Sequence, residues 1–202
     1  MAENEKRYGM LIDLETCIGC HACTVSCKIE NEVAEGNFNT WVEEWDEGDY
    51  PKVARAKLPK MCNHCIDAPC IPVCPVDATY AIDGGAVVID EETCIGCGAC
   101  VEACPYDARY MNEETKKAGK CTFCIQRVEA GMVPSCVSSC VSHARIFGDI
   151  NDPDSEVSKK FKENDVHGLK EDLKLDLAVK YIGLDKILKD GKEPEDRYKG
   201  GK

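Results

Sequence analysis

The sequence predicts an α+β fold made of two small units, one nested inside the other, with irregular insertions and a C-terminal extension. Three observations lead to this prediction. The cysteines form four groups of four, strand-like segments border these groups, and a seven-residue stretch recurs within the chain. Aromatic residues make up only 6% of the 202 residues. Because so few large side chains give a thin core, we expect bound metal or cross-links to help hold the fold.

The cysteine spacing is the most informative feature of the chain. The groups are I (Cys17, Cys20, Cys23, Cys27), II (Cys62, Cys65, Cys70, Cys74), III (Cys94, Cys97, Cys100, Cys104) and IV (Cys121, Cys124, Cys136, Cys140). Groups I and III have the C-x2-C-x2-C-x3-C spacing of bacterial two-cluster ferredoxins. Three closely spaced thiolates can reach three corners of a [4Fe–4S] cube, whereas the fourth points away and serves a second cluster. The sequence therefore predicts four [4Fe–4S] clusters with all sixteen cysteines as iron ligands.

Zinc and disulfides are the alternative uses of so many cysteines. Zinc ribbons separate two C-x2-C pairs by a long loop, whereas groups I and III crowd three cysteines into seven residues. Disulfides belong mainly to oxidising compartments, and the polar N-terminus predicts no export signal of the chain's own. Both alternatives are therefore disfavoured.

Residues between the cysteines fit the same chemistry. Gly19 and Gly96 allow the backbone to approach a cluster and to aim N–H groups at its sulfurs. His21 and His64 lie within cysteine groups, where we expect a hydrogen bond to sulfur or a surface role rather than ligation. The remaining two histidines, His143 and His167, show no ligand spacing.

Strand-like segments indicate how the groups pair. A ferredoxin-like unit has a strand that enters its first cysteine run and pairs with a strand that leaves its second. Residues 8–13 are expected to form the strand entering group I, and residues 144–149 the strand leaving group IV. Residues 79–90 predict a hairpin between groups II and III that turns at residues 83–85. Residues 74–80 recur as residues 104–110 with five of seven positions identical, which supports two related units.

These patterns give a domain prediction. Residues 1–30 with 111–150 form a split ferredoxin-like unit (groups I and IV), and residues 62–110 form the inner unit (groups II and III). Residues 31–61 are an acidic insertion, and residues 151–202 are a C-terminal extension with a mobile end.

Within each unit, the fourth cysteine is expected to cross to the other cluster. The predicted ligand sets are set 1 (Cys17, Cys20, Cys23, Cys140), set 2 (Cys27, Cys121, Cys124, Cys136), set 3 (Cys62, Cys65, Cys70, Cys104) and set 4 (Cys74, Cys94, Cys97, Cys100).

The two insertions carry weaker signals. Eight acidic residues lie between Glu30 and Asp49 without a lysine or arginine, near Trp41 and Trp45. This predicts either a solvated acidic loop whose tryptophans cover a core edge or a docking surface for a partner. Leucines alternate along residues 169–179 and predict an extended segment, whereas residues 186–201 are expected to be a mobile tail.

Charge and hydropathy exclude two classes of function. The net charge is −12, and four oxidised clusters with their thiolates would add roughly −8. So acidic a protein repels nucleic acid and prefers partners with basic docking surfaces. The sequence has no apolar run approaching ~18 residues, so we expect no direct membrane insertion.

Several stretches together carry a resemblance to a known family. They are residues 17–31, 62–70, 94–110, 120–124 and 147–158. They resemble the four-cluster iron–sulfur subunits of molybdopterin oxidoreductases in the dimethyl sulfoxide reductase superfamily, most of all the polysulfide and thiosulfate reductase type. The likeness covers about residues 8–182. Groups I and IV depart from the ferredoxin motif, because neither is followed by proline.

The resemblance implies a role in anaerobic respiration. A chain of this kind is not an enzyme on its own, but relays electrons between a large molybdopterin (Mo or W) catalytic subunit and a membrane-anchored quinone-reacting subunit. In such complexes the group I cluster faces the catalytic subunit, followed by those of groups IV, II and III. Co-export with the catalytic subunit would place the chain on the outer face of the cytoplasmic membrane, and a cytoplasmic location is the alternative.

Two other functions are compatible with the cysteines. One is a free polyferredoxin that carries electrons between soluble enzymes, and the other is a cluster subunit of a hydrogenase or tungsten enzyme. The acidic tryptophan segment and the extension beyond group IV favour a dedicated subunit, because a diffusible carrier has little use for them.

Overall fold

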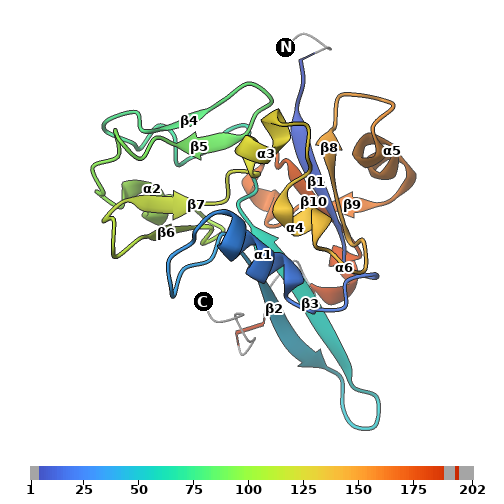
Figure 1. The fold of residues 1–202 in the computed structure, drawn as a ribbon. Helices are drawn as coiled ribbons and strands as arrows, with labels where there is room; N and C mark the ends of the chain where they lie inside the picture. Colours follow the sequence, from blue (N-terminus) through green and yellow to red (C-terminus); the bar gives the residue numbers. More distant parts are fainter. Residues whose placement is uncertain (1–4, 189–193, 196–202) are drawn as a thin grey trace.

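The computed structural model describes residues 5–188 and 194–195 and combines short helices with short strands, which confirms the α+β class (Figure 1). The strands are β1 (Tyr8–Asp13), β2 (Thr40–Glu47), β3 (Ala54–Met61), β4 (Thr79–Ala81), β5 (Val87–Ile89), β6 (Arg109–Met111), β7 (Ala118–Lys120), β8 (Arg145–Asp149), β9 (Val166–His167) and β10 (Val179–Ile182). The helices are α1 (Ala22–Glu30), α2 (Ala99–Glu102), α3 (Ile125–Glu129), α4 (Ser135–Ser138), α5 (Glu156–Glu163), the 3-10 turn η1 (Glu171–Leu173) and α6 (Leu184–Ile187).

A four-stranded sheet in the order β8-β1-β10-β9 joins the two ends of the chain. β1 pairs antiparallel with β8, from Tyr8 opposite Asp149 to Ile12 opposite Arg145, so the predicted pairing of the strands around groups I and IV is confirmed. The inner residues of β1 are completely buried because the strand is covered on both faces, which suits its apolar sequence.

The C-terminal extension contributes two strands to this sheet. β10 lies parallel to β1, and β9 lies antiparallel to β10. Leu177 and Val179 are buried, but the predicted extended segment is broken by η1, which leaves Leu173 exposed. Of the predicted mobile tail, Lys186 and Ile187 lie in α6, and most of the remainder is outside the described residues.

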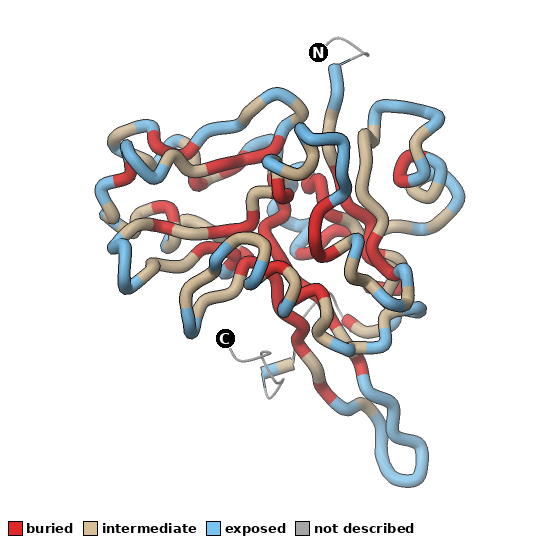
Figure 2. Tube along the Cα trace, in the orientation of Figure 1, coloured by how far each residue is buried: buried red, intermediate tan, exposed pale blue. Residues whose placement is uncertain are grey.

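The acidic insertion was expected to be irregular, but its second half is a regular hairpin of β2 and β3. The eight residues of β2 pair antiparallel with the eight of β3, and the hairpin projects from the body to an exposed tip (Figures 1 and 2). Trp41 and Trp45 lie four residues apart in β2, so their side chains point to the same face of the strand. Both are buried, and their apolar surface holds the strand against the body of the protein. Tyr50 at the tip is 92% exposed.

The predicted hairpin between groups II and III is confirmed. β4 pairs antiparallel with β5, and Gly84 and Gly85 turn the chain with positive φ angles of 86° and 76°. A side chain at position 84 would meet the ring of Tyr8 at 2.6 Å, so this turn also needs glycine for packing. The strands around groups II and III do not pair with each other, because β3 pairs with β2 and β6 pairs with β7. The nesting of one unit in the other stays a prediction.

The hairpin of β2 and β3 contains a buried ion pair that should be needed for its stability. Lys60 Nζ lies 3.3 Å from Glu43 Oε1, and that carboxylate also accepts a hydrogen bond from Trp41 Nε1 at 3.0 Å. Glu43→Ala removes the carboxylate of this buried pair together with its hydrogen bond from Trp41, so we expect the free energy of unfolding to fall by about 3 kcal/mol. Chemical denaturation monitored by tryptophan fluorescence measures this.

The matched control is Arg55→Ala in the same hairpin, which removes a solvent-exposed pair with Asp46. We expect little change because water screens exposed charges. Equal effects of the two substitutions would contradict a role for burial.

Candidate metal centres

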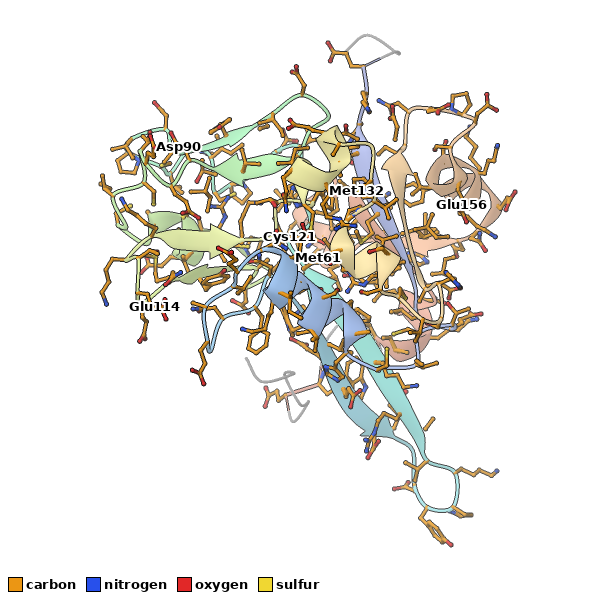
Figure 3. All side chains as sticks on the ribbon, in the orientation of Figure 1. Met61, Asp90, Glu114, Cys121, Met132 and Glu156 are labelled. Atoms are coloured by element: carbon orange, nitrogen blue, oxygen red, sulfur yellow. The ribbon has the colours of Figure 1, made fainter. Side chains whose placement is uncertain are left out.

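All sixteen cysteines are free thiols, and the structure forms no disulfide with any of them. Nine are buried, and only Cys20 and Cys97 are exposed. Cys121 lies at the centre of the molecule, whereas Glu114 and Glu156 lie at its periphery (Figure 3). The interior is therefore rich in thiols that are not cross-linked to each other.

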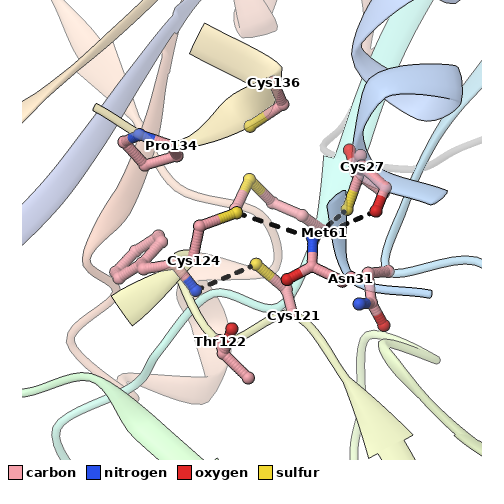
Figure 4. Close-up of a pocket in the computed structure, with 11 residues that line it drawn as sticks. Cys27, Asn31, Met61, Cys121, Thr122, Cys124, Pro134 and Cys136 are labelled. Carbon is pink, nitrogen blue, oxygen red and sulfur yellow. Dashed lines mark hydrogen bonds between the residues drawn. The ribbon is translucent and has the colours of Figure 1, made fainter. Parts of the chain in front are cut away.

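The thiols of set 2 line one cavity in the middle of the molecule. Cys27 reaches it from α1, Cys121 and Cys124 from the loop between β7 and α3, and Cys136 from α4 (Figure 4). Asn31 Nδ2 donates hydrogen bonds to the sulfurs of Cys27, at 3.4 Å, and Cys124, at 3.6 Å. Sulfurs 97 residues apart in the chain thus face one space.

The thiols of set 1 line a second cavity. Cys17 and Cys20 come from the loop before α1, Cys23 comes from the first turn of α1, and Cys140 follows the end of α4. α1 and α4 are held together by hydrogen bonds from Ser135 Oγ to Ser26 O at 3.2 Å and between the hydroxyls of Ser26 and Ser139 at 2.7 Å. This helix pair brings the last cysteine of group IV to group I.

Sets 3 and 4 come together in the other half of the chain. Cys74 lines one cavity with Cys94, Cys97 and Cys100. Burial raises the pKa of Cys65 to about 12, and Cys62, Cys104 and Cys70 add to the rise, so these four thiols are electrostatic neighbours. The fourth cysteine of each group therefore lies with the partner group. That the four sets bind iron stays a prediction.

The surroundings of the thiols fit an iron–sulfur cluster. Burial raises the pKa of Cys74, but N–H groups of Val76, Thr79 and Ala78 point at its sulfur and lower the pKa below the ordinary value overall. Phe123 N–H donates to Cys121 Sγ at 3.4 Å. Soft thiolates with N–H donors are the donor set that iron–sulfur clusters take.

Buried polar atoms without a partner also lie beside the cysteines. In the described part of the chain they include the amide of Asn63, the Nε2 of His64 and the hydroxyl of Tyr106, each within two residues of a cysteine. Such atoms need an acceptor or donor that the protein atoms do not supply. Across the same residues, no three or more His, Cys, Asp or Glu side chains form a site for a single metal ion.

The histidines behave differently from one another. His64 is completely buried, so a surface role is wrong for it. Its Nδ1 accepts from Val87 N–H at 3.0 Å, and its ring stacks on Phe123 with centroids 3.6 Å apart. His21 Nε2 lies 3.6 Å from Glu44 Oε1, and His143 is exposed. His167 lies beside carboxylates, with Nε2 3.4 Å from Asp165.

Three buried cations beside the cysteines were missed by sequence reasoning. Arg109 Nη2 lies 3.0 Å from Cys70 Sγ, Lys120 Nζ donates to the carbonyl of Cys121, and Arg145 Nη1 lies 3.8 Å from Cys136 Sγ. The chain contained a signal for two of them. Arg109 and Arg145 each follow the last cysteine of a group by five residues and are each preceded by alanine.

Comparisons with known proteins agree with this chemistry. The family described as a 4Fe-4S dicluster domain matches residues 53–150, and the one described as a 4Fe-4S binding domain matches residues 8–29. A tetrathionate reductase subunit of Salmonella typhimurium is 50% identical over 184 residues, covering 89% of this chain and 73% of that protein.

Two further relatives have related names. A putative dimethyl sulfoxide reductase iron-sulfur subunit of Halobacterium salinarum is 42% identical, covering 87% of this chain and 78% of that protein. A sulfite dehydrogenase subunit of Allochromatium vinosum is 41% identical, covering 78% of this chain and 75% of that protein.

The crossing of the fourth cysteine can be tested at Cys140. We expect Cys140→Ser to change the electron paramagnetic resonance (EPR) spectrum in the way that Cys20→Ser does, because serine is a harder ligand and both residues belong to set 1. Cys27→Ser is the mirror-image control and should resemble Cys124→Ser. The assignment fails if Cys140→Ser instead reproduces the spectrum of Cys124→Ser.

The thiol pKa values predict an order of reaction in the reduced, metal-free chain. The thiolate is the reactive form, and the pKa is lowered at Cys74 but raised by burial to about 12 at Cys65. At pH 8 iodoacetamide should therefore modify Cys74 at least about tenfold faster than Cys65. This ratio already allows for the weaker nucleophilicity of a thiolate whose pKa is low.

Neither residue is fully buried, so the reagent can reach both thiols. Mass spectrometry at several pH values measures both rates. The Cys65 rate should keep rising towards pH 12 while the Cys74 rate levels off, and parallel pH profiles would contradict the assigned environments.

Proposed function

This chain belongs to the family of iron–sulfur subunits of molybdopterin oxidoreductases, and from that premise we propose that it relays electrons through four [4Fe–4S] clusters between a catalytic subunit and a second redox partner. It is a non-catalytic electron-transfer subunit of an oxidoreductase complex that contains a catalytic subunit. The bound clusters supply one-electron oxidation and reduction. The chain's residues hold the clusters, exclude water from them and set their order.

The grouping of the thiols is the observation that carries this proposal. Each predicted ligand set contains three cysteines of one group and one of its partner group, and the structure brings each set together. Sixteen cysteines divided in this way account for four clusters with no cysteine left over.

Contacts between the sets support one linear order, 1–2–3–4. Arg145 lines the cavity of set 1 and contacts Cys136 of set 2. Cys62 of set 3 adds to the raised pKa of Cys121 of set 2, after burial, which is the largest cause. Cys70 of set 3 packs in the same apolar cluster as Cys94 of set 4. This order corresponds to groups I, IV, II and III.

The two ends of this order are the places where thiols reach the surface. Cys20 in set 1 and Cys97 in set 4 are the exposed cysteines. Each is near an exposed isoleucine at the equivalent position, Ile18 at 57% and Ile95 at 62%. Exposed apolar residues beside a redox centre suit docking, so we propose that one partner docks at each end. The family resemblance favours the catalytic subunit at the set 1 end and the second partner at the set 4 end.

We further propose that the four sets belong to two ferredoxin-like units. Residues 1–30 with 111–150 make the split outer unit, and residues 62–110 make the inner one. The pairing of β1 with β8 and the hairpin of β4 and β5 support the division. The acidic insertion at 31–61 ends in the hairpin of β2 and β3, whose exposed tip offers a docking surface.

The partners and the location follow from the family and remain proposals. The names of the relatives favour a catalytic subunit that acts on a sulfur oxyanion such as tetrathionate. No helix in residues 5–188 and 194–195 is long and apolar enough to cross a bilayer. We propose that a quinone-reacting membrane subunit anchors the complex at the outer face of the cytoplasmic membrane, and that the chain is exported with its catalytic subunit.

Native purification with metal analysis tests the proposed function. A tagged chain purified anaerobically from its own cells should contain about sixteen iron atoms, four for each cluster. It should co-purify with a large subunit that contains stoichiometric molybdenum or tungsten. Tetrathionate should then oxidise the reduced clusters within the complex.

Two results would count against the proposal. A homogeneous monomer that contains iron but no molybdenum or tungsten would favour the free carrier. Iron near eight atoms per chain would mean that two of the ligand sets bind no cluster.

A further inference from the structure

Arg109, Lys120 and Arg145 are buried cations in an otherwise strongly acidic protein. They are only 3%, 4% and 4% exposed. Within the part of the chain that the structure describes, none of the three forms an ion pair with a carboxylate. A buried charge is strongly unfavourable unless an opposite charge lies close to it. The groups that can supply that charge are the neighbouring thiolates with their clusters.

Arg145 lies between sets 1 and 2. Its Nη1 is 3.8 Å from Cys136 Sγ of set 2, and its Nη2 donates to Thr40 Oγ1 at 3.0 Å. The same side chain lines the cavity that contains the four thiols of set 1. Its other contacts at Nη1 are the neutral sulfurs of Met10 and Met61.

Lys120 lies between sets 2 and 3. Its Nζ donates to the carbonyl of Cys121, which belongs to set 2. Burial raises the pKa of both Cys121 and Cys70, and the charge of Lys120 opposes the rise at each of them. Because Cys70 belongs to set 3, one ammonium group acts on two sets.

Arg109 lies between sets 3 and 4. Its Nη2 is 3.0 Å from Cys70 Sγ of set 3, and its Nη1 donates to Thr79 Oγ1 at 3.2 Å. Burial lowers the pKa of Arg109, but Cys70, Cys62 and Cys100 raise it above the ordinary value overall. Cys100 belongs to set 4, so this guanidinium also faces two sets.

The two arginines occupy equivalent places, each five residues after the last cysteine of its group. Each is the first residue of the strand that leaves its group, β6 for Arg109 and β8 for Arg145. Each also donates one hydrogen bond to a buried threonine hydroxyl, which fixes the guanidinium. The arrangement is therefore built twice with the same parts.

We propose that Arg145, Lys120 and Arg109 are positioning charges, one at each junction between successive ligand sets, that raise the reduction potentials of the two clusters they separate. This inference rests on the proposed function, because it requires the four clusters. A cluster with four thiolates is already negative, and an added electron makes it more so. A cation in a poorly solvated junction stabilises the reduced form on both sides and lessens the repulsion between neighbours.

Anaerobic redox titration of the loaded full-length chain, followed by EPR, tests this inference. Arg109→Gln should move two of the four midpoint potentials to more negative values. At a fixed potential the ratio of reduced to oxidised cluster should fall at least tenfold in each of these two clusters. A tenfold fall corresponds to a shift of about 59 mV in the midpoint potential of a one-electron couple. Arg145→Gln should move the other two, those of sets 1 and 2.

Three further variants separate charge from shape. Arg109→Lys keeps the charge and should restore most of the potential, whereas Arg55→Gln removes an exposed arginine of the hairpin and should change nothing. Lys120→Met should affect the clusters of sets 2 and 3. If Arg109→Gln loses iron, retention of iron by Arg109→Lys supports the charge requirement.

The inference is overturned if Arg109→Lys and Arg109→Gln shift the potentials equally or lose iron equally. It is also overturned if all four potentials move together or none moves. The iron content of the unaltered chain separates this failure from a failure of the proposed function. About sixteen irons with unshifted variants would reject the positioning charges alone, whereas an unaltered chain without four clusters would reject the proposed function.

Discussion

The attraction between buried thiolate-rich sites and buried cations is the interaction on which the rest of this structure depends. Ordinary small proteins fill their interior with apolar side chains, but here nine buried cysteines and three buried cations without a carboxylate partner share that space in the described part of the chain. Neither population is stable there alone, because thiolates repel one another and isolated cations lose their hydration. Together, and with the proposed clusters bound, they would form an interior whose negative charge is partly compensated. The fold and the loading of metal are therefore expected to be coupled.

The sequence predicted correctly those features that neighbouring residues determine by themselves. The spacing of cysteines, the strand at residues 8–13 and the turn at Gly84 and Gly85 each have a local physical cause, and the structure has the expected strand pairing and turn. The grouping of the fourth cysteines could also be anticipated, because a thiol three residues beyond a tight loop cannot return to the same cluster. The helix pair α1 and α4, joined through Ser26 and Ser139, provides the contact that the spacing only implied.

Tertiary packing decided the features that the sequence did not reveal. The run of acidic residues concealed the burial of Trp41 and Trp45, since Glu43 on the same strand is neutralised by Lys60 only after the hairpin forms. Likewise β10 joins β1 across more than 160 residues, a pairing with no local signal. His64 was expected to contact sulfur or solvent, but its stacking on Phe123 depends on a group 59 residues away. Local patterns cannot report such contacts.

Position relative to the last cysteine of a group accounts for two of the three junction cations. Five residues after the last cysteine, group III has Arg109 and group IV has Arg145, whereas group II has Thr79, which accepts the hydrogen bond of Arg109. A repeat that duplicated an arginine at every such position would place two guanidinium groups against each other at the junction of sets 3 and 4. Threonine at one of them removes that repulsion and fixes the remaining charge. The outer sides of sets 1 and 4 are open at Cys20 and Cys97. Equivalent positions in three cysteine groups thus provide two of the junction cations and the threonine that fixes one of them, whereas Lys120 comes from outside this pattern.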